Sequence, residues 1–176
     1  EMVHALRGMF AFGIWDGRER ALFLARDPLG IKPLYYADSG ETLRFASQVK
    51  ALLKGGAIDA SPEPAGSAGF LLWGCVPEPY TLFRDIRSLP AGATLTARLG
   101  KSGAPRPYFS VRDTLEHAQQ DPRMLGENDY GELDEAVRDS VRHHLVSDVP
   151  VGIFLSAGVD SSLIASIAAG ENRASL

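Results

Sequence analysis

Residues 150–162 read PVGIFLSAGVDSS, a short apolar run followed by small residues and one carboxylate. The run from Pro150 to Leu155 contains β-branched and aromatic residues, a pattern that predicts a buried strand. Ser161 and Ser162 then open the stretch LIASIAA, whose apolar spacing and good helix formers predict a helix. We therefore predict a strand, a tight turn and a helix in succession, an arrangement that can bind an anion.

The turn has the composition of a phosphate site. Small residues let backbone N–H groups approach an anion, and a helix start adds about half a positive charge and several unpaired donors. Ser156, Ser161 and Ser162 can donate hydroxyl hydrogen bonds, and Asp160 can hold a magnesium ion directly or through water. The alternative is an ordinary loop whose serines cap the helix. We favour phosphate binding because all these features occur together.

The turn differs from two common phosphate motifs and resembles a third. It has no Gly-Lys-Ser/Thr, which a Walker A loop needs, and no Gly-x-Gly-x-x-Gly of the dinucleotide folds. It resembles the Ser-Gly-Gly-x-Asp-Ser loop of the ATP pyrophosphatases, which cleave ATP between the α and β phosphates. Ala157 stands where that motif has its first glycine. The Cβ of Ala157 requires an ordinary backbone conformation at this position.

The position of the turn predicts incomplete domains. Only 14 residues follow Ser162, too few for the remaining strands of a doubly wound sheet. The first residue is Glu1, and a strand-like run begins almost at once at Met9. We therefore expect a piece of a longer protein, with two partial domains joined by a linker.

Composition and charge exclude several classes of function. The chain is 45% hydrophobic and 23% charged, as in soluble globular proteins, and no run approaches the roughly 18 apolar residues of a membrane span. No signal peptide is evident. Residues 1–109 carry 13 basic and 10 acidic side chains, whereas residues 110–150 carry 4 and 10. No basic stripe is present, so we expect neither nucleic acid nor a membrane as a partner.

Short apolar runs alternate with turn residues in the first part of the chain. The turns contain Asp-Gly, Asp-Pro-Leu-Gly and Ser-Gly, which predict a four-stranded antiparallel meander. Its strands are expected at residues 10–15, 21–26, 34–37 and 43–46. Residues 47–53 predict a short helix ended by Gly55 and Gly56, and residues 93–99 predict a further strand.

The second part of the chain begins with a predicted linker. Residues 110–127 are polar and lack periodicity. Beyond them, apolar residues recur three or four positions apart and predict an amphipathic helix with Asn128 or Asp129 as its N-cap. These apolar positions are Tyr130, Leu133, Val137, Val141 and Leu145.

Other candidate sites have simpler interpretations. A single cysteine excludes an intrachain disulfide and a multi-cysteine zinc site, and the apolar neighbours of Cys75 predict a buried structural thiol. His143 and His144 are adjacent on a predicted helix, so their side chains point about 100° apart, which favours packing over metal binding. Arg26 and Asp27 form either a functional ion pair or a pair that stabilises a turn, and Asp-Pro-Leu-Gly favours the turn.

Aromatic residues in the first part are expected in the core or in an interface. They are Trp15, Tyr35 and Tyr36. Their setting among apolar residues argues against a surface on which nucleic-acid bases stack.

Several motifs occur in a fixed order along the chain. They are GMFAF (8–12), RDPLGIKPLYY (26–36), FASQVKAL (45–52), LPAG (89–92), SDVPVG (147–152) and LSAGVDSS (155–162). In this order they resemble the glutamine-hydrolysing asparagine synthetase family, and they cover nearly the whole chain except the linker.

The resemblance implies a fold class of α+β followed by α/β. Residues 1–109 would be the later part of a glutaminase domain with antiparallel sheets of the N-terminal-nucleophile (Ntn) hydrolase type. Residues 110–127 would be a linker. Residues 128–176 would supply the first helix, strand, loop and helix of a doubly wound ATP-pyrophosphatase domain.

The resemblance also implies an activity. Members of the family release ammonia from glutamine with an N-terminal cysteine, activate aspartate with ATP, and amidate it as AMP leaves. The implied substrates are glutamine, aspartate and ATP, the implied metal is magnesium, and a homodimer is compatible with the family. ATP use and the lack of an export segment imply a cytoplasmic location.

The family's functional residues transfer only in part. Leu155 matches a position whose backbone contacts the nucleotide, and the pyrophosphate-binding positions are Ser156, Gly158, Asp160, Ser161 and Ser162. The nucleophilic cysteine would lie upstream of Gly8, and Cys75 matches no catalytic position. The 176 residues alone are therefore expected neither to hydrolyse glutamine nor to make asparagine.

Two alternatives stay open at the level of sequence. A relative could use the same domains to form another amide, in β-lactam or peptide-ring synthesis or in a sugar or antibiotic pathway. A degenerate, non-catalytic paralogue is the second alternative, and Ala157 is the only residue that favours it.

Overall fold

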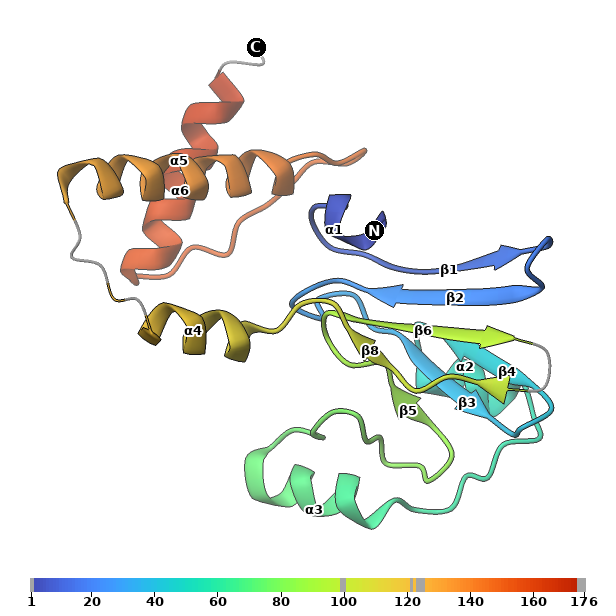
Figure 1. The fold of residues 1–176 in the computed structure, drawn as a ribbon. Coiled ribbons are helices and arrows are strands. Elements are labelled where there is room, and N and C mark those ends of the chain that lie inside the picture. Colours follow the sequence, from blue (N-terminus) through green and yellow to red (C-terminus); the bar gives the residue numbers. More distant parts are fainter. Residues whose placement is uncertain (1, 99–100, 121, 123–125, 174–176) are drawn as a thin grey trace. The chain divides into compact units, whose positions relative to one another are not determined.

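The structure is a computed structural model that describes residues 2–98, 101–120, 122 and 126–173. It divides into two compact units, residues 1–119 and residues 120–176. Figure 1 shows antiparallel strands and short helices in the first unit and helices in the second. No helix among the described residues is long and apolar enough to span a membrane.

The first unit contains two antiparallel sheets. The larger runs in the order β1-β2-β6-β7, and β8 also pairs with β6. Its strands are β1 (Ala11–Asp16), β2 (Ala21–Arg26), β6 (Ala93–Arg98), β7 (Lys101–Ser102) and β8 (Arg106–Pro107). The smaller runs in the order β4-β3-β5, with β3 (Tyr35–Asp38), β4 (Leu43–Ala46) and β5 (Arg87–Ser88).

The four predicted strands exist, but the predicted single meander is wrong. β1 pairs with β2 and β3 pairs with β4, whereas β2 and β3 belong to different sheets. The second edge of β2 is taken by β6, which is distant in sequence, with Leu24 opposite Leu95. Between β2 and β3 the chain makes a tight turn around the Asp27 carboxylate, which carries it out of the first sheet.

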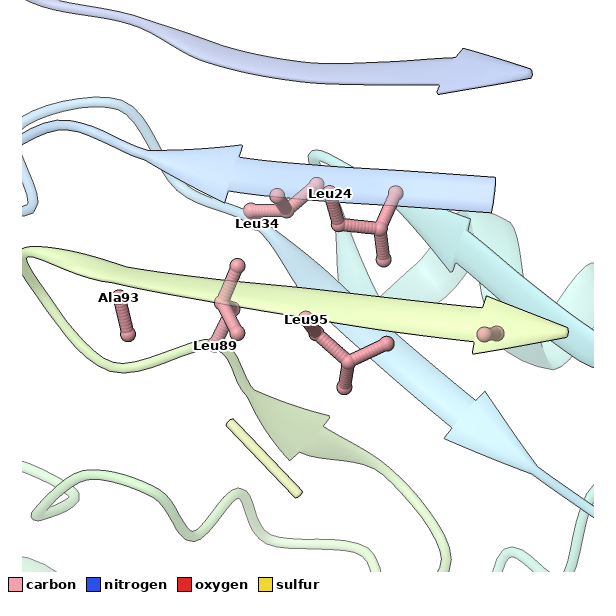
Figure 2. Packing of buried hydrophobic residues seen from close by; sticks show 6 residues of the cluster. Leu24, Leu34, Leu89, Ala93 and Leu95 are labelled. Atoms are coloured by element: carbon pink, nitrogen blue, oxygen red, sulfur yellow. The ribbon is translucent and has the colours of Figure 1, made fainter. Parts of the chain in front are cut away.

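The main hydrophobic core joins the two sheets. Figure 2 shows its largest side chains, with Leu24 on β2 and Leu95 on β6. The buried members of this cluster are Leu24, Leu34, Leu89, Ala93, Leu95 and Ala97. Tyr36 from β3 packs against it, and Tyr35 packs against a second cluster under α2 (Val49–Lys54), so the prediction for these two tyrosines is confirmed. Trp15 is exposed and is not a core residue.

The predicted short helix is present as α2, which ends at Gly55. Two further helices lie in the first unit, α1 (Met2–Ala5) and α3 (Pro64–Trp73). Helix α3 was not predicted from the sequence, and Glu63 caps its first turn. Cys75 lies just beyond its last residue and is exposed, so the prediction of a buried thiol is wrong. Gly74 adopts a left-handed conformation (φ 72°) that ends the helix and turns the chain outward.

The stretch predicted as a linker contains a helix, α4 (Val111–Gln120). Ser110 caps its first turn by accepting a hydrogen bond from the Asp113 N–H at 3.1 Å. Arg112 and Glu116 form an (i, i+4) ion pair along its surface. These local interactions stabilise a helix that has no buried residues. The helix was not predicted because the prediction relied on the spacing of apolar residues.

The second unit contains α5 (Glu127–His144) and α6 (Val159–Arg173), which pack through Val141, Ile167 and Ala168. The amphipathic helix is therefore confirmed as α5. Its N-cap is Gly126, not Asn128 or Asp129. The Asp129 carboxylate instead accepts a hydrogen bond from the Gly126 N–H at 2.6 Å.

The strand predicted at residues 150–155 does not form. Residues 151–156 have no regular secondary structure, and Phe154 is fully exposed. A strand exists only through hydrogen bonds to a neighbour, and no strand pairs with this segment among the residues that the structure describes. The helix that follows is present as α6 and begins at Val159.

Shortening the central leucine tests the account of the core. We expect Leu24→Ala to lower the free energy of unfolding by about 3 kcal/mol, because the side chain is fully buried and would leave a cavity. Leu115→Ala, at an exposed position of α4, should change it by less than about 0.5 kcal/mol. Urea unfolding followed by circular dichroism measures both, and equal losses would contradict the assignment of the core.

Candidate functional site

The predicted anion-binding loop is a cluster of hydroxyl groups at the start of α6. The Ser156 and Ser161 hydroxyl oxygens are 2.9 Å apart. The Ser161 Oγ accepts a hydrogen bond from the Ser156 N–H at 3.3 Å, and the Ser156 Oγ accepts one from the Gly158 N–H at 3.2 Å. The predicted residues Ser156, Gly158 and Ser161 are therefore brought together around one turn.

Ser162 makes two hydrogen bonds at the start of α6. The Ser162 hydroxyl donates to the Gly158 carbonyl oxygen at 2.9 Å, and the Ser162 N–H donates to the same oxygen at 3.1 Å. Ser156 and Ser161 accept from N–H groups of the loop itself, so these two serines organise the loop and do not cap the helix in the usual way.

The two remaining predicted residues flank this cluster. Asp160 lies in the first turn of α6, and its side chain is exposed. Leu155 precedes the serines and is also exposed. The loop thus exposes hydroxyl groups and one carboxylate, while the Ser156 and Gly158 N–H groups donate to hydroxyl oxygens within the loop. That set of groups can bind phosphate oxygens and share a hard cation with them.

Gly158 packs closely against a serine of the loop. A Cβ at this position would lie 3.3 Å from the Ser156 Oγ, closer than a relaxed contact. Ala157 stands where the loop of the ATP pyrophosphatases has a glycine, and its φ angle is not positive. The backbone at Ala157 therefore has an ordinary conformation that alanine can adopt, as predicted from the sequence.

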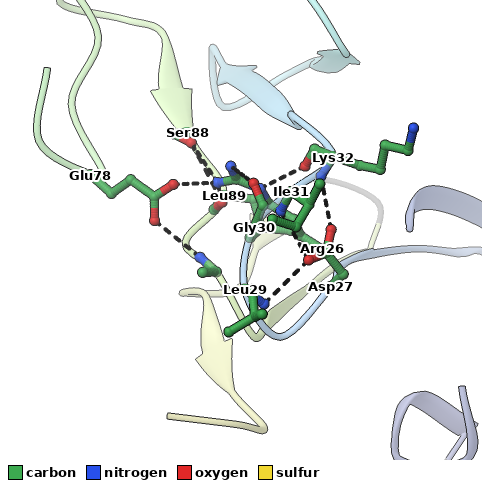
Figure 3. A network of polar contacts seen from close by, with 10 residues as sticks. Arg26, Asp27, Leu29, Gly30, Ile31, Lys32, Glu78, Ser88 and Leu89 are labelled. Carbon is green, nitrogen blue, oxygen red and sulfur yellow. Dashed lines mark hydrogen bonds and ion pairs between the residues drawn. The ribbon is translucent and has the colours of Figure 1, made fainter. Parts of the chain in front are cut away.

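A second polar cluster lies in the first unit, around Arg26 and Asp27 (Figure 3). Both side chains are buried. The Asp27 carboxylate accepts hydrogen bonds from the N–H groups of Leu29, Ile31 and Lys32, at 3.2, 2.9 and 2.9 Å. These three bonds fix the turn between the two sheets, so the prediction that the residues stabilise a turn is confirmed for Asp27.

Arg26 has a different partner from the one predicted. Its guanidinium donates to the carbonyl oxygens of Gly30, Lys32 and Leu89 and to the Ser88 hydroxyl. Its ion pair is with Glu78, at 2.5 Å, and Glu78 also accepts a hydrogen bond from the Ala91 N–H. Nothing in the sequence indicated Glu78, which is 52 positions away from Arg26.

Tyr108, which comes late in the sequence of the first unit, also contacts this cluster. Its hydroxyl donates to the Arg26 carbonyl oxygen at 2.8 Å. Burial raises the pKa of Tyr108, and the nearby charge of Asp27 raises it further. The hydroxyl therefore stays protonated and continues to donate through the neutral pH range.

A cavity of about 270 Å³ lies beside Arg26. Its wall is mainly apolar and aromatic, and the Arg26–Glu78 pair supplies its charged groups. The lining residues are Arg26, Tyr35, Val49, Val76, Glu78, Tyr80, Thr81, Leu82, Phe83 and Ser88. Because the two charges are paired, the residues that line this cavity carry no net charge.

The two histidines lie along α5. His143 Nδ1 lies 2.7 Å from the Asp139 carbonyl oxygen, and His144 Nδ1 lies 2.8 Å from that of Ser140. Each ring is thus bonded to the preceding turn of its own helix. The described residues contain no group of three or more potential metal ligands.

Two parts of the chain match models of known protein families. Residues 1–109 match the family model of the glutamine amidotransferase domain, and residues 132–176 match that of asparagine synthase. The chain belongs to the glutamine-hydrolysing asparagine synthetase family. The resemblance predicted from the ordered motifs is confirmed.

Several relatives in this family are similar over nearly the whole chain. The chain is 37% identical over 168 residues to asparagine synthetase [glutamine-hydrolyzing] 1 of Bacillus subtilis, which covers 96% of this chain. It is 38% identical over 177 residues to a putative asparagine synthetase of Mycobacterium tuberculosis, covering 98%. It is 36% identical over 169 residues to asparagine synthetase B of Escherichia coli, covering 95%.

The chain spans only a part of each relative. It covers 26% of the length of the Bacillus subtilis and Mycobacterium tuberculosis proteins and 24% of the Escherichia coli protein. The antiparallel sheets and helices of the first unit are consistent with a glutaminase domain.

Removing the charge at the turn between the sheets tests its role. We expect Asp27→Asn to lower the free energy of unfolding by about 2 kcal/mol, because the new amide cannot accept all three buried hydrogen bonds. Asp85→Asn changes an exposed carboxylate of the same unit and should change the free energy of unfolding by less than about 0.5 kcal/mol. Calorimetry of both variants measures the effect, and an unchanged Asp27→Asn protein would refute it.

Proposed function

We propose that the protein to which these residues belong is a glutamine-dependent asparagine synthetase. Its glutaminase half would release ammonia from glutamine. Its synthetase half would join the side-chain carboxylate of aspartate to the α-phosphorus of ATP, with pyrophosphate as the leaving group. Ammonia would then attack the acyl carbon, and AMP would leave with the bonding electrons.

The observation that carries this proposal is the hydroxyl cluster at the start of α6. Pyrophosphate is a multiply charged leaving group, so its departure requires donors aimed at the charge that develops on it. The hydroxyl groups of Ser156, Ser161 and Ser162 and the Gly158 N–H make hydrogen bonds within the loop, and they would turn to the pyrophosphate, next to the positive end of the helix dipole, when it binds. The backbone of Leu155 would contact the nucleotide.

The residues of the loop also suit magnesium. The available donors are one carboxylate and several hydroxyl groups, all of them oxygen ligands of the kind that magnesium prefers. Magnesium in nucleotide sites is usually held by one or two carboxylates together with phosphate oxygens, so Asp160 alone is sufficient on the protein side. When bound, magnesium would neutralise charge on the departing pyrophosphate.

We further propose that the chain contains parts of two domains with different activities. Residues 1–109 would form part of a glutaminase domain of the Ntn-hydrolase type, with its nucleophilic cysteine outside the 176 residues. Residues 110–127 would connect it to residues 128–176, the start of a doubly wound ATP-pyrophosphatase domain. An ATP-consuming biosynthetic reaction of this kind belongs in the cytoplasm.

The full-length protein, supplied with ATP, magnesium, glutamine and aspartate, provides the test. We expect pyrophosphate and asparagine to appear in equal amounts. Pyrophosphate release only when another carboxylate replaces aspartate would assign the protein to a different amide-forming synthetase. No turnover with any acceptor would refute the proposal and leave a non-catalytic paralogue.

Substitutions in the loop test the residues assigned to pyrophosphate. We expect Asp160→Ala to lower kcat for asparagine formation at least about 100-fold, and Ser161→Ala to lower it about 10-fold, since each loses stabilisation of the leaving group. Ser166→Ala removes an exposed hydroxyl further along α6 and should leave kcat unchanged. Equal rates for Ser161→Ala and Ser166→Ala would contradict the assignment.

A substitution in the first unit should affect asparagine formation from glutamine and not from ammonium chloride. Arg26→Lys replaces a guanidinium that makes five interactions with a group that has three donors, so it should disturb the glutaminase half. We expect asparagine formation from glutamine to fall about 10-fold while formation from ammonium chloride is retained.

The exposed Arg98, which pairs weakly with Glu19, offers the matched control. Arg98→Lys should affect neither nitrogen source. If Arg26→Lys lowered both activities equally, Arg26 would not belong specifically to the glutaminase half.

A further inference from the structure

The segment that leaves the sheets of the first unit is held by backbone hydrogen bonds. The Tyr108 and Phe109 N–H groups both donate to the Gly92 carbonyl oxygen, at 2.8 and 3.2 Å. Gly92 has a positive φ angle of 60°, and a Cβ at this position would lie 2.5 Å from the Phe109 carbonyl oxygen. Only glycine fits at this contact, so residues 108 and 109 lie directly against the turn at Gly92.

The turn at Gly92 is itself bonded to the turn at Asp27. The Gly92 N–H donates to the Asp27 carbonyl oxygen at 2.8 Å, and the Gly30 N–H donates to the same oxygen at 3.0 Å. The Asp27 carboxylate also binds its own turn, through three further N–H groups. Backbone hydrogen bonds thus connect residues 108 and 109 with the turn that joins the two sheets.

The Tyr108 side chain makes a second link to this turn. Its hydroxyl donates to the Arg26 carbonyl oxygen at 2.8 Å, and its ring meets the His4 ring edge to face, with the centroids 5.7 Å apart. Arg26 is fixed by the hydrogen bonds of its buried guanidinium, so the Tyr108 hydroxyl is bonded to a well-held part of the unit. Tyr108→Phe would remove this bond and keep the ring.

Tyr108 lies at the boundary between the two halves of the chain. The match to the glutamine amidotransferase domain ends at residue 109, and the match to asparagine synthase begins at residue 132. Helix α4 begins at Val111, and Ser110 caps its first turn. Figure 1 shows the chain passing from β8 into α4 through this short segment. The hydrogen bonds of Tyr108 therefore fix the point from which the connection to the second half starts.

We propose that Tyr108 is a positioning residue for the transfer of ammonia from the glutaminase half to the synthetase half, an inference that rests on the proposed function. Ammonia that escapes into solvent is diluted, so transfer is efficient only while the two halves are held in place. The Tyr108 hydroxyl ties the start of the connecting segment to the Arg26 carbonyl oxygen of the glutaminase half. Without this bond the segment gains freedom, and part of the ammonia is lost before it attacks the acyl carbon.

The test uses the full-length protein and measures the glutamate and asparagine formed from glutamine. Full coupling gives one glutamate for each asparagine. We expect Tyr108→Phe to raise the glutamate formed per asparagine at least about 2-fold, because one hydrogen bond of ordinary net strength changes an equilibrium constant about 5-fold. The rate of glutamate release and the rate of asparagine formation from ammonium chloride should both be unchanged.

The exposed Tyr130 of α5 offers the matched control. Tyr130→Phe also removes one hydroxyl and should leave the ratio of glutamate to asparagine as it is in the parent protein. A ratio that rises equally in both variants would show that the effect is not specific to Tyr108 and would overturn the proposal.

Three further results for Tyr108→Phe would overturn it. An unchanged ratio would show that the hydroxyl does not serve the transfer. A fall in glutamate release at a constant ratio would place Tyr108 in glutamine hydrolysis, and an equal fall with both nitrogen sources would give it a role in folding or in the synthetase half. A parent protein that makes no asparagine from either nitrogen source would refute the proposed function and this inference with it, whereas the other results leave the proposed function standing.

Discussion

The first unit depends on the buried guanidinium of Arg26. This group donates to the carbonyl oxygens of Gly30 and Lys32 on one side and to Ser88 and Leu89 on the other. It thereby ties the end of β2 to the end of β5, which belong to different sheets. A buried charge is stable only when it is paired and its donors are satisfied, and Glu78 supplies the countercharge. The core between the sheets can form because this polar junction holds their ends together.

Motifs that are local in sequence could be predicted, and contacts between distant segments could not. The turn at Asp27 was predictable because Asp-Pro-Leu-Gly is good turn chemistry and the hydrogen bonds to the Asp27 carboxylate all come from within five residues. The pairing of β2 with β6 was not, since the apolar run in Ala21–Arg26 indicates a strand but does not indicate which strand pairs with it. For the same reason Glu78 was missed as the partner of Arg26.

The other errors have a similar origin. Residues 150–155 have the composition of a buried strand, but a strand needs a neighbour, and the described residues provide none. The loop after it depends on short-range bonds between Ser156, Gly158 and Ser161, so its serines come together as the sequence predicted. Cys75 was assigned to the core because its neighbours are apolar, yet α3 turns its glycines inward and its large apolar residues outward.

We propose that the loop at the start of α6 serves a synthetase that activates aspartate with ATP. The most direct measurement is the exchange of labelled pyrophosphate into ATP by the full-length protein, with aspartate and magnesium present and no nitrogen source. The account predicts exchange that requires aspartate and is lost in Asp160→Ala, because only a reversible acyl-adenylate returns pyrophosphate to ATP. Exchange that does not depend on aspartate, or that survives Asp160→Ala, would contradict it.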